Sequence, residues 1–360
     1  MFHLLDQMRR RQGNLLDSLG LGPETAPSRI VLAEPGFRLR AYGGDGEPAV
    51  LIVPAPIKRH YIWDLEPGVS AVRRLAGAGF PTYLVEWLEQ PAGTPSGGLA
   101  EHAGRLLDRA VAAVEADSGR PRPVLAGHSL GGTLAAIFAA SRPGRVRGLV
   151  LLEAPLRFGP EAGALAPLVA AGPGAAGITA TYGDAPGSLL TYGSLAAAPD
   201  SFLWSVLADR LQSWGDPEAR RRHGRVRRWT LDEFPMPARL FEEVVEHLYR
   251  EDRFARGTLA LDGVPAAASA IDCPVLAVVD PASRVVPRGS AVPPVPAFAR
   301  PESLVLEHGG DRGVALRHVA ALVGPALHAG LWPRLLDWIG RRAGQAAPPT
   351  DRRKPGSATA

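Results

Sequence analysis

The chain has 360 residues, of which 46% are apolar, so it is long enough to bury a large core, yet no apolar run reaches the roughly 18 residues that a membrane span needs. Basic residues exceed acidic ones by only four, which argues against nucleic acid as a partner. The single cysteine, Cys273, excludes an internal disulfide and a thiolate metal cluster. We therefore expect a globular, cytoplasmic protein without a signal peptide or a transmembrane segment.

The first 44 residues are predicted to hold a short helix and the first strands. The helix covers about residues 1–20, where apolar residues recur on one side of an otherwise charged segment. These apolar residues are Phe2, Leu4, Leu5, Met8, Leu15 and Leu16. We expect this helix to cap the body of the protein or to meet a partner.

Short apolar runs that end at turn residues follow along the chain and predict buried parallel strands. They are Ala49–Val53, Thr82–Val85, Val124–Ala126, Leu149–Leu152, Val275–Val279 and Leu304–Leu306. Helical patterns lie between them, at Gly68–Ala78, Leu99–Ala116 and Leu130–Ala140. The alternation of strand and helix is typical of a mostly parallel, doubly wound α/β sheet.

The alternation stops after Pro155 and resumes near Asp272. We interpret residues 156–265, first rich in Ala, Gly and Pro and then amphipathic with several Trp, as an inserted cap or lid. The core is then formed by residues 45–155 and 266–343 and closes with a helix around Trp332–Ile339. Residues 344–360 have the composition of a disordered tail.

One motif carries chemistry. Residues Pro123–Gly132, P-V-L-A-G-H-S-L-G-G, place Ser129 between a buried strand and a helix, which is the setting of a nucleophile elbow. Such a turn is strained and brings strand and helix close together, so it needs very small residues two positions on either side of the serine. Gly127 and Gly131 meet that need, and the motif predicts an α/β-hydrolase fold.

The elbow directs the Ser129 hydroxyl to the carboxyl end of the strand, beside the start of the next helix. Free N–H groups and the helix dipole there favour a developing oxyanion, and the Leu130 N–H is the first donor we expect. His128, the neighbour of the serine, is interpreted as a structural residue.

A serine nucleophile also needs a base and a group that orients the base, which this fold supplies after late strands in the order acid, then histidine. The carboxylate after Val275–Val279 is Asp280, and the imidazole after Leu304–Leu306 is His308. We name these two with Ser129 as the candidate triad, although a residue at the end of a buried strand also has a structural explanation. His318, on a predicted helix, is the weaker candidate for the base.

Three longer segments resemble the polyhydroxyalkanoate synthases. They are V-L-I-V-P-A-P-I-K-R-H-Y-I-W-D-L at Val50–Leu65, G-S-L-L-T-Y-G-S-L at Gly187–Leu195 and L-Y-R-E-D-R-F-A-R-G-T-L at Leu248–Leu259. The resemblance covers about residues 45–340, and it implies an acyltransferase that takes hydroxyacyl-coenzyme A and extends a polyester on a covalent acyl-enzyme. Coenzyme A would enter only with the substrate, and no metal or bound cofactor is implied. A second synthase-type subunit, a homo-oligomer and association with polyester granules are compatible with the resemblance.

The chain departs from this family at four positions. Ser129 stands where the family has its nucleophilic cysteine. Ser283 stands at the position of the family's acid, and Asp311 at the position of its base. Pro56, near the second oxyanion donor, has no N–H to offer.

Two substitutes for the lost acid and base remain open. Asp280 and His308 each lie three residues before the family's positions and could restore a dyad. Asp311 could instead hydrogen-bond Ser129 directly, although an ordinary carboxylate is a weak base for a serine.

Two functions follow. We expect an enzyme that transfers or hydrolyses acyl groups of esters or thioesters through Ser129. The alternative is a catalytically inactive relative that binds a synthase, an acyl ligand or a polyester granule. An imidazole within roughly 3 Å of the serine hydroxyl would distinguish the first from the second.

Overall fold

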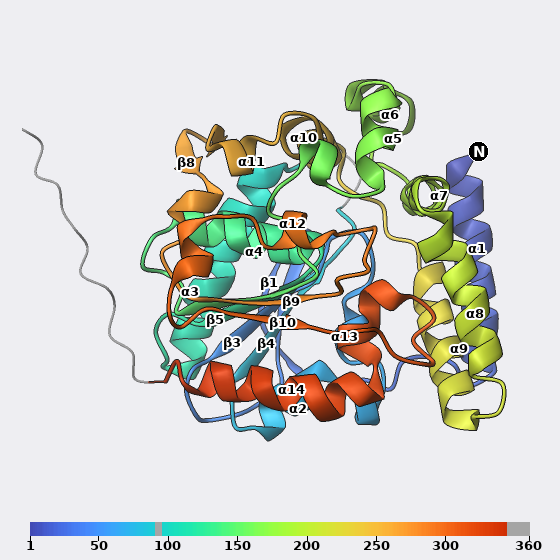
Figure 1. The fold of residues 1–360 in the computed structure, drawn as a ribbon, viewed down its shortest axis with the longest axis horizontal. Helices are drawn as coiled ribbons and strands as arrows, with labels where there is room; N and C mark the ends of the chain where they lie inside the picture. Colours follow the sequence, from blue (N-terminus) through green and yellow to red (C-terminus); the bar gives the residue numbers. More distant parts are fainter. Residues whose placement is uncertain (91–95, 344–360) are drawn as a thin grey trace, which may run out of the picture.

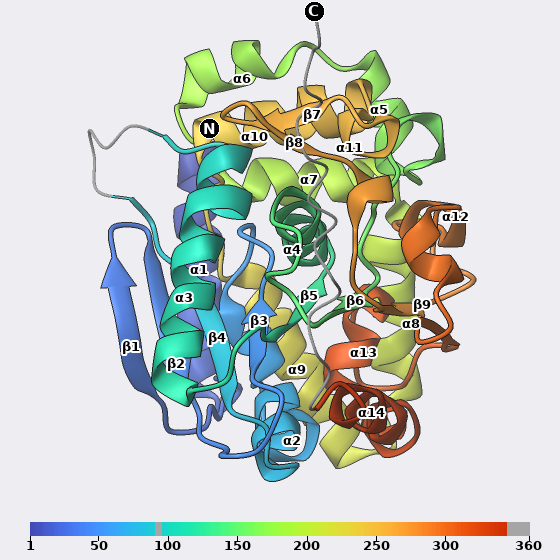
Figure 2. The same ribbon diagram turned by 90° about the vertical axis from the view of Figure 1, so that its left-hand side faces the viewer.

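An eight-stranded sheet forms the centre of the computed structural model, which describes residues 1–90 and 96–343. The strand order is β1-β2-β4-β3-β5-β6-β9-β10, and Figure 2 shows these strands crossing the molecule from β1 to β9. The strands from β4 to β10 are parallel, and β1 and β2 extend the sheet as an antiparallel hairpin. Their bounds are β1 (Arg29–Glu34), β2 (Phe37–Ala41), β3 (Val50–Val53), β4 (Thr82–Trp87), β5 (Val124–His128), β6 (Gly148–Leu152), β9 (Val275–Val279) and β10 (Leu304–Glu307). The predicted doubly wound sheet is thus confirmed, while the predicted tail lies outside the described residues.

The inner strands are apolar because both faces of the sheet are covered. Every residue of β3, β5, β6 and β9 is buried. Their register aligns the ends of the strands, since His128 lies opposite Leu152, and Leu152 lies opposite Val278. The residues that follow β5, β6, β9 and β10 therefore meet at one edge of the sheet, where ligands bind in open parallel sheets.

Helices cover the two faces of the sheet, with α3 and α4 on one side and α2, α13 and α14 on the other (Figure 1). Their bounds are α2 (Ala71–Gly77), α3 (Leu107–Ser118), α4 (Leu130–Ser141), α13 (Ala320–Val323) and α14 (Pro325–Gly340). The predicted helix at Leu130–Ala140 is confirmed, whereas the one at Leu99–Ala116 starts as a π-helical segment, Ala100–Leu106, before α3.

Within the described residues, no single helix is long and apolar enough to cross a membrane. In the same residues one bent pair of helices, Arg317–Val323 and Pro325–Gly340, with 66° between its halves, reaches that length and composition. Trp332 and Ile339 of this pair are buried in the core beneath the sheet.

The chain between β6 and β9, where the sequence predicts the cap, is mainly helical. It contains α5 (Leu165–Ala171), α6 (Ala175–Tyr182), α7 (Gly187–Ala197), α8 (Ser205–Gln212), α9 (Pro217–Leu231), α10 (Ala238–Glu243), α11 (Arg253–Arg256), β7 (Leu259–Leu261) and β8 (Val264–Ala266). One further short helix, α12 (Arg288–Ala291), follows β9. Figure 1 shows α8 and α9 beside α1 at one end of the molecule, and α5, α6 and α10 above α4. The insertion therefore packs on two sides of the core.

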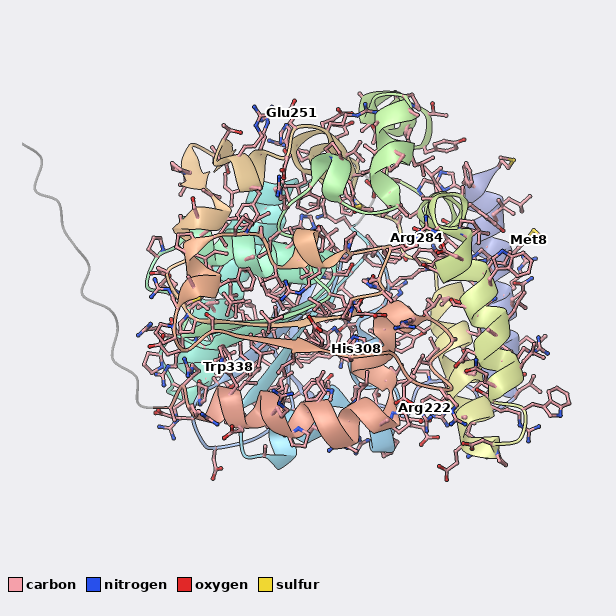
Figure 3. The ribbon with its side chains drawn as sticks, in the orientation of Figure 1. Met8, Arg222, Glu251, Arg284, His308 and Trp338 are labelled. Atoms are coloured by element: carbon pink, nitrogen blue, oxygen red, sulfur yellow. The ribbon has the colours of Figure 1, made fainter. Side chains whose placement is uncertain are left out.

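The N-terminal helix α1 (Phe2–Ser18) is attached to the body mainly through polar contacts. The Asp6 carboxylate accepts the N–H of Ser188 at 2.8 Å, and Arg9 forms an ion pair with Glu233 at 2.6 Å. Of the predicted apolar residues, Leu4, Met8 and Leu15 are exposed, as Met8 is in Figure 3, whereas Phe2, Leu5 and Leu16 are half-buried.

Candidate functional site

Ser129 occupies a strained turn between β5 and α4. Its φ is 53° and its ψ is −133°, a conformation that a residue with a Cβ rarely adopts. The Ser129 N–H donates to the carbonyl of Leu152 at 3.0 Å, so the turn is joined to the end of the neighbouring strand. Strain of this kind persists where the surrounding structure enforces it, and it is found at functional sites.

The glycines of the motif are required by this close approach of strand and helix. A Cβ on Gly131 would lie 2.1 Å from the carbonyl oxygen of Val53, and a Cβ on Gly127 would lie 2.5 Å from the Cα of Gly132. Both distances are far below any real carbon contact. No larger residue fits at these two positions without moving the elbow.

The start of α4 offers donors for an oxyanion. The carbonyl of Ser129 accepts the N–H groups of Gly132 and Thr133, at 2.9 and 3.2 Å. In the described part of the chain, the N–H groups of Leu130 and Gly131 have no hydrogen-bond acceptor. Two free donors beside a serine hydroxyl form the kind of site that stabilises a tetrahedral intermediate.

Asp280 and His308, the predicted acid and base, are not hydrogen-bonded to each other. Asp280 is buried after β9, and its Oδ1 accepts the Nη2 of Arg317 at 2.9 Å and the N–H of Ala282 at 3.0 Å. The Nε of Arg317 contacts the other oxygen. An arginine rather than a histidine therefore neutralises this carboxylate.

His308 is bound instead to Glu153. Its Nε2 lies 3.1 Å from Glu153 Oε1, and its Nδ1 accepts the N–H of Gly310 at 3.1 Å. Acceptance at Nδ1 assigns the proton to Nε2, which then donates to the carboxylate. The side chain is only 1% exposed and lies inside the molecule beside α13 in Figure 3. Because both ring nitrogens are engaged, His308 has no nitrogen left for Ser129 in this conformation.

Glu153 is the functional candidate that the sequence reasoning missed. It directly follows β6, has a φ of 43°, and accepts hydrogen bonds from two imidazoles, those of His308 and His318. Burial favours the neutral carboxyl, but the two histidines outweigh it and lower the pKa of Glu153 to about 2. The signal was present, since Glu153 is the first acid after the strand next to the elbow and precedes both histidines in the chain.

His318 is the imidazole with a free nitrogen. Its Nδ1 lies 3.1 Å from Glu153 Oε2, and its Nε2 has no hydrogen-bond partner among the described residues. A carboxylate on Nδ1 keeps the proton there and leaves the Nε2 lone pair available, as in a general base.

His128 supports this arrangement and is structural, as the sequence predicts. Its Nε2 donates to the carbonyl of His318 at 2.8 Å, and the two rings lie 4.5 Å apart. Burial, with a smaller effect of His318, lowers the pKa of His128 to about 3, so the ring stays neutral. The residue before the serine therefore holds the histidine segment against the end of β5.

The chain between the two histidines is held by a buried carboxylate of α8. Asp209 accepts the N–H groups of Gly313 and Ala315, each at 2.8 Å, and contacts Nδ1 of His223 at 2.7 Å. Burial favours the neutral form of the Asp209 carboxyl, but the three contacts, of which that with His223 is the largest, favour the charged form more strongly. Together they lower the pKa of the Asp209 carboxyl. Asp209 thereby connects the helical insertion to the loop that carries His308 and His318.

A cavity of about 200 Å³ lies between the insertion and the ends of the strands. Its lining includes Ser201 and Ser205 on one side and Asp280, Ser283 and His318 on the other. Ser129 is not among the lining residues, and in the described structure no hydrogen bond joins its hydroxyl to an imidazole. The nucleophile and the histidine with the free nitrogen are thus close in the fold, since His128 next to Ser129 contacts the His318 carbonyl, but they are not hydrogen-bonded in the described structure.

Ser283 and Asp311, the residues at the family's acid and base positions, accept hydrogen bonds from backbone N–H groups. The Ser283 hydroxyl accepts the N–H of Val286 at 3.1 Å. Asp311 accepts the N–H of Ala326 at 2.7 Å in the first turn of α14. Neither is hydrogen-bonded to Ser129, the contact that was left open for Asp311.

Cys273 does not replace the family's cysteine. It is buried away from the elbow, before β9, and burial raises the pKa of its thiol to about 12. A thiol in this state is not a nucleophile at neutral pH.

Comparison with known proteins agrees with this architecture. Residues 48–188 match the family of the alpha/beta hydrolase fold. The chain is 26% identical over 330 residues to a poly(3-hydroxyalkanoate) polymerase subunit of Haloferax mediterranei, covering 88% of this chain and 64% of that protein. It is 25% identical over 352 residues to the corresponding subunit of Haloarcula marismortui, covering 91% and 70%. The chain therefore spans less than two thirds of the first relative's length.

A solved structure shows the same fold. The monoacylglycerol lipase of Paleococcus ferrophilus superposes with a TM-score of 0.54 at 16% identity, covering 85% of this chain and 99% of that one. The predicted resemblance and fold are confirmed: the chain is an α/β-hydrolase-fold protein related to the poly(3-hydroxyalkanoate) polymerase subunits.

Proposed function

We propose that the protein is an enzyme that transfers or hydrolyses acyl groups of esters or thioesters, with Ser129 as the nucleophile. The observation that carries the proposal is the elbow, where a strained serine stands beside the free N–H groups of Leu130 and Gly131.

The reaction proceeds through an acyl-enzyme. The Ser129 hydroxyl attacks the carbonyl carbon and gives its proton to a base, while the carbonyl oxygen becomes an oxyanion held by Leu130 and Gly131. The intermediate collapses as the alcohol or thiol leaves with that proton. Water or an acceptor hydroxyl then attacks the acyl-enzyme, which completes hydrolysis or transfer.

His318 is the base that the contacts favour. Its Nε2 is free, whereas both nitrogens of His308 are engaged. Glu153 would orient the ring and stabilise the imidazolium formed during the attack. The His318 side chain must move to reach Ser129, and catalytic hydrogen bonds often tighten only when substrate binds.

The substrate we propose is a hydroxyacyl thioester, because two relatives that match most of the chain are named as poly(3-hydroxyalkanoate) polymerase subunits. Coenzyme A would take part only as the leaving thiol. Serine in place of cysteine suits attack on an oxygen ester as well, so hydrolysis of the polyester is the second reaction to measure.

One other function is favoured by a specific observation. Among the described residues Ser129 has no hydrogen bond to an imidazole, and Pro56 removes a backbone donor near the elbow. These features suit a catalytically inactive relative that binds a synthase, an acyl ligand or a polyester granule.

A fluorophosphonate probe, which labels only activated serines, separates the two functions. We expect covalent labelling of the protein, no labelling of Ser129→Ala, and strongly reduced labelling of His318→Ala. His247→Ala, whose ring lies in the insertion and makes no contact with Glu153, serves as the matched control and should be labelled like the wild type.

Each outcome is decisive. Labelling lost in His308→Ala but retained in His318→Ala would transfer the role of base to His308. No labelling of a wild-type protein that is folded by circular dichroism would favour the inactive relative. If the wild type is labelled, a separate, unlabelled sample is assayed for release of free thiol from a hydroxyacyl-coenzyme A, with Ser129→Ala as the blank.

A further inference from the structure

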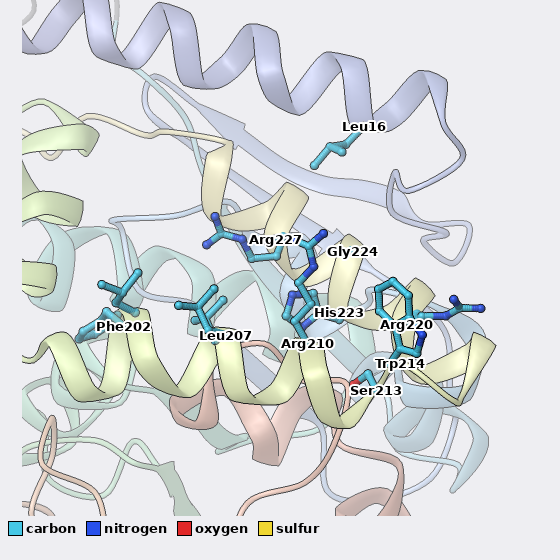
Figure 4. A pocket seen from close by; sticks show the side chains of 12 residues that line it. Leu16, Phe202, Leu207, Arg210, Ser213, Trp214, Arg220, His223, Gly224 and Arg227 are labelled. Atoms are coloured by element: carbon cyan, nitrogen blue, oxygen red, sulfur yellow. The ribbon is translucent and has the colours of Figure 1, made fainter.

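A groove far from the elbow runs between α1 and α8, with α9 as its floor. Figure 4 shows Leu16 of α1 on one rim, Leu207 and Trp214 on the other, and Arg227 of α9 between them. The groove contains a cavity of about 460 Å³. Its walls are apolar, while cationic side chains line its floor and one rim.

The two helices that flank the groove carry exposed apolar residues at helical spacing, of which Leu207 and Trp214 line the groove itself. On and beside α8 these are Trp204, Leu207, Leu211 and Trp214, separated by three or four residues. On and beside α1 they are Met1, Leu4, Met8, Leu15 and Leu19, separated by three, four or seven residues. Leu211 is 73% exposed, Trp214 69% and Leu15 63%. This spacing is that of a heptad seam, which packs against another helix.

The orientation of α1 makes this exposure informative. The helix turns Asp6, Arg9 and Gly13 towards the body, whereas Leu4, Met8 and Leu15 are exposed. A helix that served only to cap the body would bury the opposite side. Large apolar side chains that gather at exposed positions around a groove mark a site of interaction.

The cations of the groove have no partner of their own. Arg210, Arg220 and Arg227 line it, and none of them forms an ion pair within the described residues. Burial, and then the nearby charges of Arg9 and Arg210, lower the pKa of Arg227. An acidic occupant would remove this repulsion.

We propose that the groove binds an acidic amphipathic helix of a partner polypeptide. Its apolar stripe would lie against the two rims and its carboxylates against the three arginines, which is a helix-in-groove mode of recognition. A second copy of the chain fits less well, because it would present the same positive charge. A lipid surface fits less well, because the site is concave between two helices.

The test uses a designed helical peptide with leucine at its heptad core and glutamate beside it. Its affinity for the full-length protein is measured by fluorescence anisotropy, and a peptide with lysine in place of every glutamate is the counterpart. We expect the acidic peptide to bind, the basic one not to bind, and added salt to weaken binding.

Matched variants locate the site. Leu207→Glu and Arg210→Glu should each weaken binding at least about tenfold, the size of effect typical of a hot spot. Leu168→Glu is the control for the first, since Leu168 on α5 is 41% exposed and Leu207 is 42% exposed. Arg221→Glu is the control for the second, since Arg221 is an exposed residue of α9 that does not line the groove. Both controls should bind the peptide like the wild type.

Other results would overturn the proposal. One is equal affinity of the protein for the two peptides, and another is unchanged affinity of Leu207→Glu for the acidic peptide. A third is a protein that binds phosphatidylglycerol vesicles but does not bind the acidic peptide. A dimer in light scattering that Leu207→Glu converts to a monomer would assign the groove to a second copy. Photo-crosslinking from position 207 in cells must yield an acidic amphipathic segment, and a basic segment or a lipid would contradict the idea.

Discussion

Replacement of Glu153 by glutamine tests the network beneath the candidate site. The wild-type carboxylate is 1% exposed and accepts hydrogen bonds from His308 and His318. A glutamine can accept at one atom only and presents an NH₂ group to the second histidine. Because the Gly310 N–H keeps the proton of His308 on Nε2, it is His318 that must change tautomer. Its Nε2 then carries a proton and is lost as a base.

The stability change follows from the pKa of the carboxyl. Burial opposes ionisation and the two histidines more than compensate, so that the pKa is about 2 against an ordinary value of 4.5. This difference corresponds to roughly 3 kcal/mol of folding free energy. A lowered acid pKa contributes stability that is present above pH 4.5 and is lost as the pH falls towards 2.

We therefore expect Glu153→Gln to lose roughly 2–3 kcal/mol at pH 7 in urea unfolding. Its difference from the wild type should shrink steadily between about pH 4.5 and pH 2. The control is Glu307→Gln, because Glu307 lies at the end of β10 with its side chain 52% exposed and should matter by less than about 0.5 kcal/mol. A difference that persists unchanged at pH 3, or a variant as stable as the wild type at pH 7, would refute the reasoning.

Three further substitutions test the elbow, the core and the histidine loop. Gly131→Ala places a Cβ 2.1 Å from a carbonyl oxygen of β3, so we expect a loss of at least about 2 kcal/mol and no serine labelling, whereas Gly68→Ala, which meets no atom within 4 Å, should be neutral. Leu51→Ala empties a fully buried site in β3 and should cost about 2–5 kcal/mol in urea unfolding, against less than about 0.5 kcal/mol for Leu168→Ala. Asp209→Asn weakens the contacts to the loop, so amide hydrogen exchange of residues 313–316 should accelerate with little change in the central strands.

Each of these has a contrary result. A Gly131→Ala protein that is stable and labelled would show that the close approach is not required. A Leu51→Ala variant whose free energy of unfolding lies within about 0.5 kcal/mol of the wild-type value would mean that neighbouring side chains fill the emptied site at little cost. Unchanged exchange in the loop of Asp209→Asn would show that other contacts hold the histidines.

Local patterns in the sequence were sufficient to predict the sheet and the elbow. An inner parallel strand must be apolar on both faces, so runs such as Val275–Val279 are visible without knowledge of the partners of each strand. The elbow is equally local, because two glycines and a serine between a strand and a helix satisfy a single steric requirement. Both predictions are borne out by the strand bounds and by the backbone conformation of Ser129.

Only the tertiary structure decided which acid and which histidine meet. The loops after β6, β9 and β10 bring Glu153, Asp280, His308, Arg317 and His318 to one edge, and their pairing depends on side-chain directions that the linear order does not contain. The same holds for α1, whose apolar stripe was visible in the sequence but whose exposure was not. A helix buries whichever side the rest of the fold can satisfy, and here Glu233 and Ser188 meet the polar side of α1.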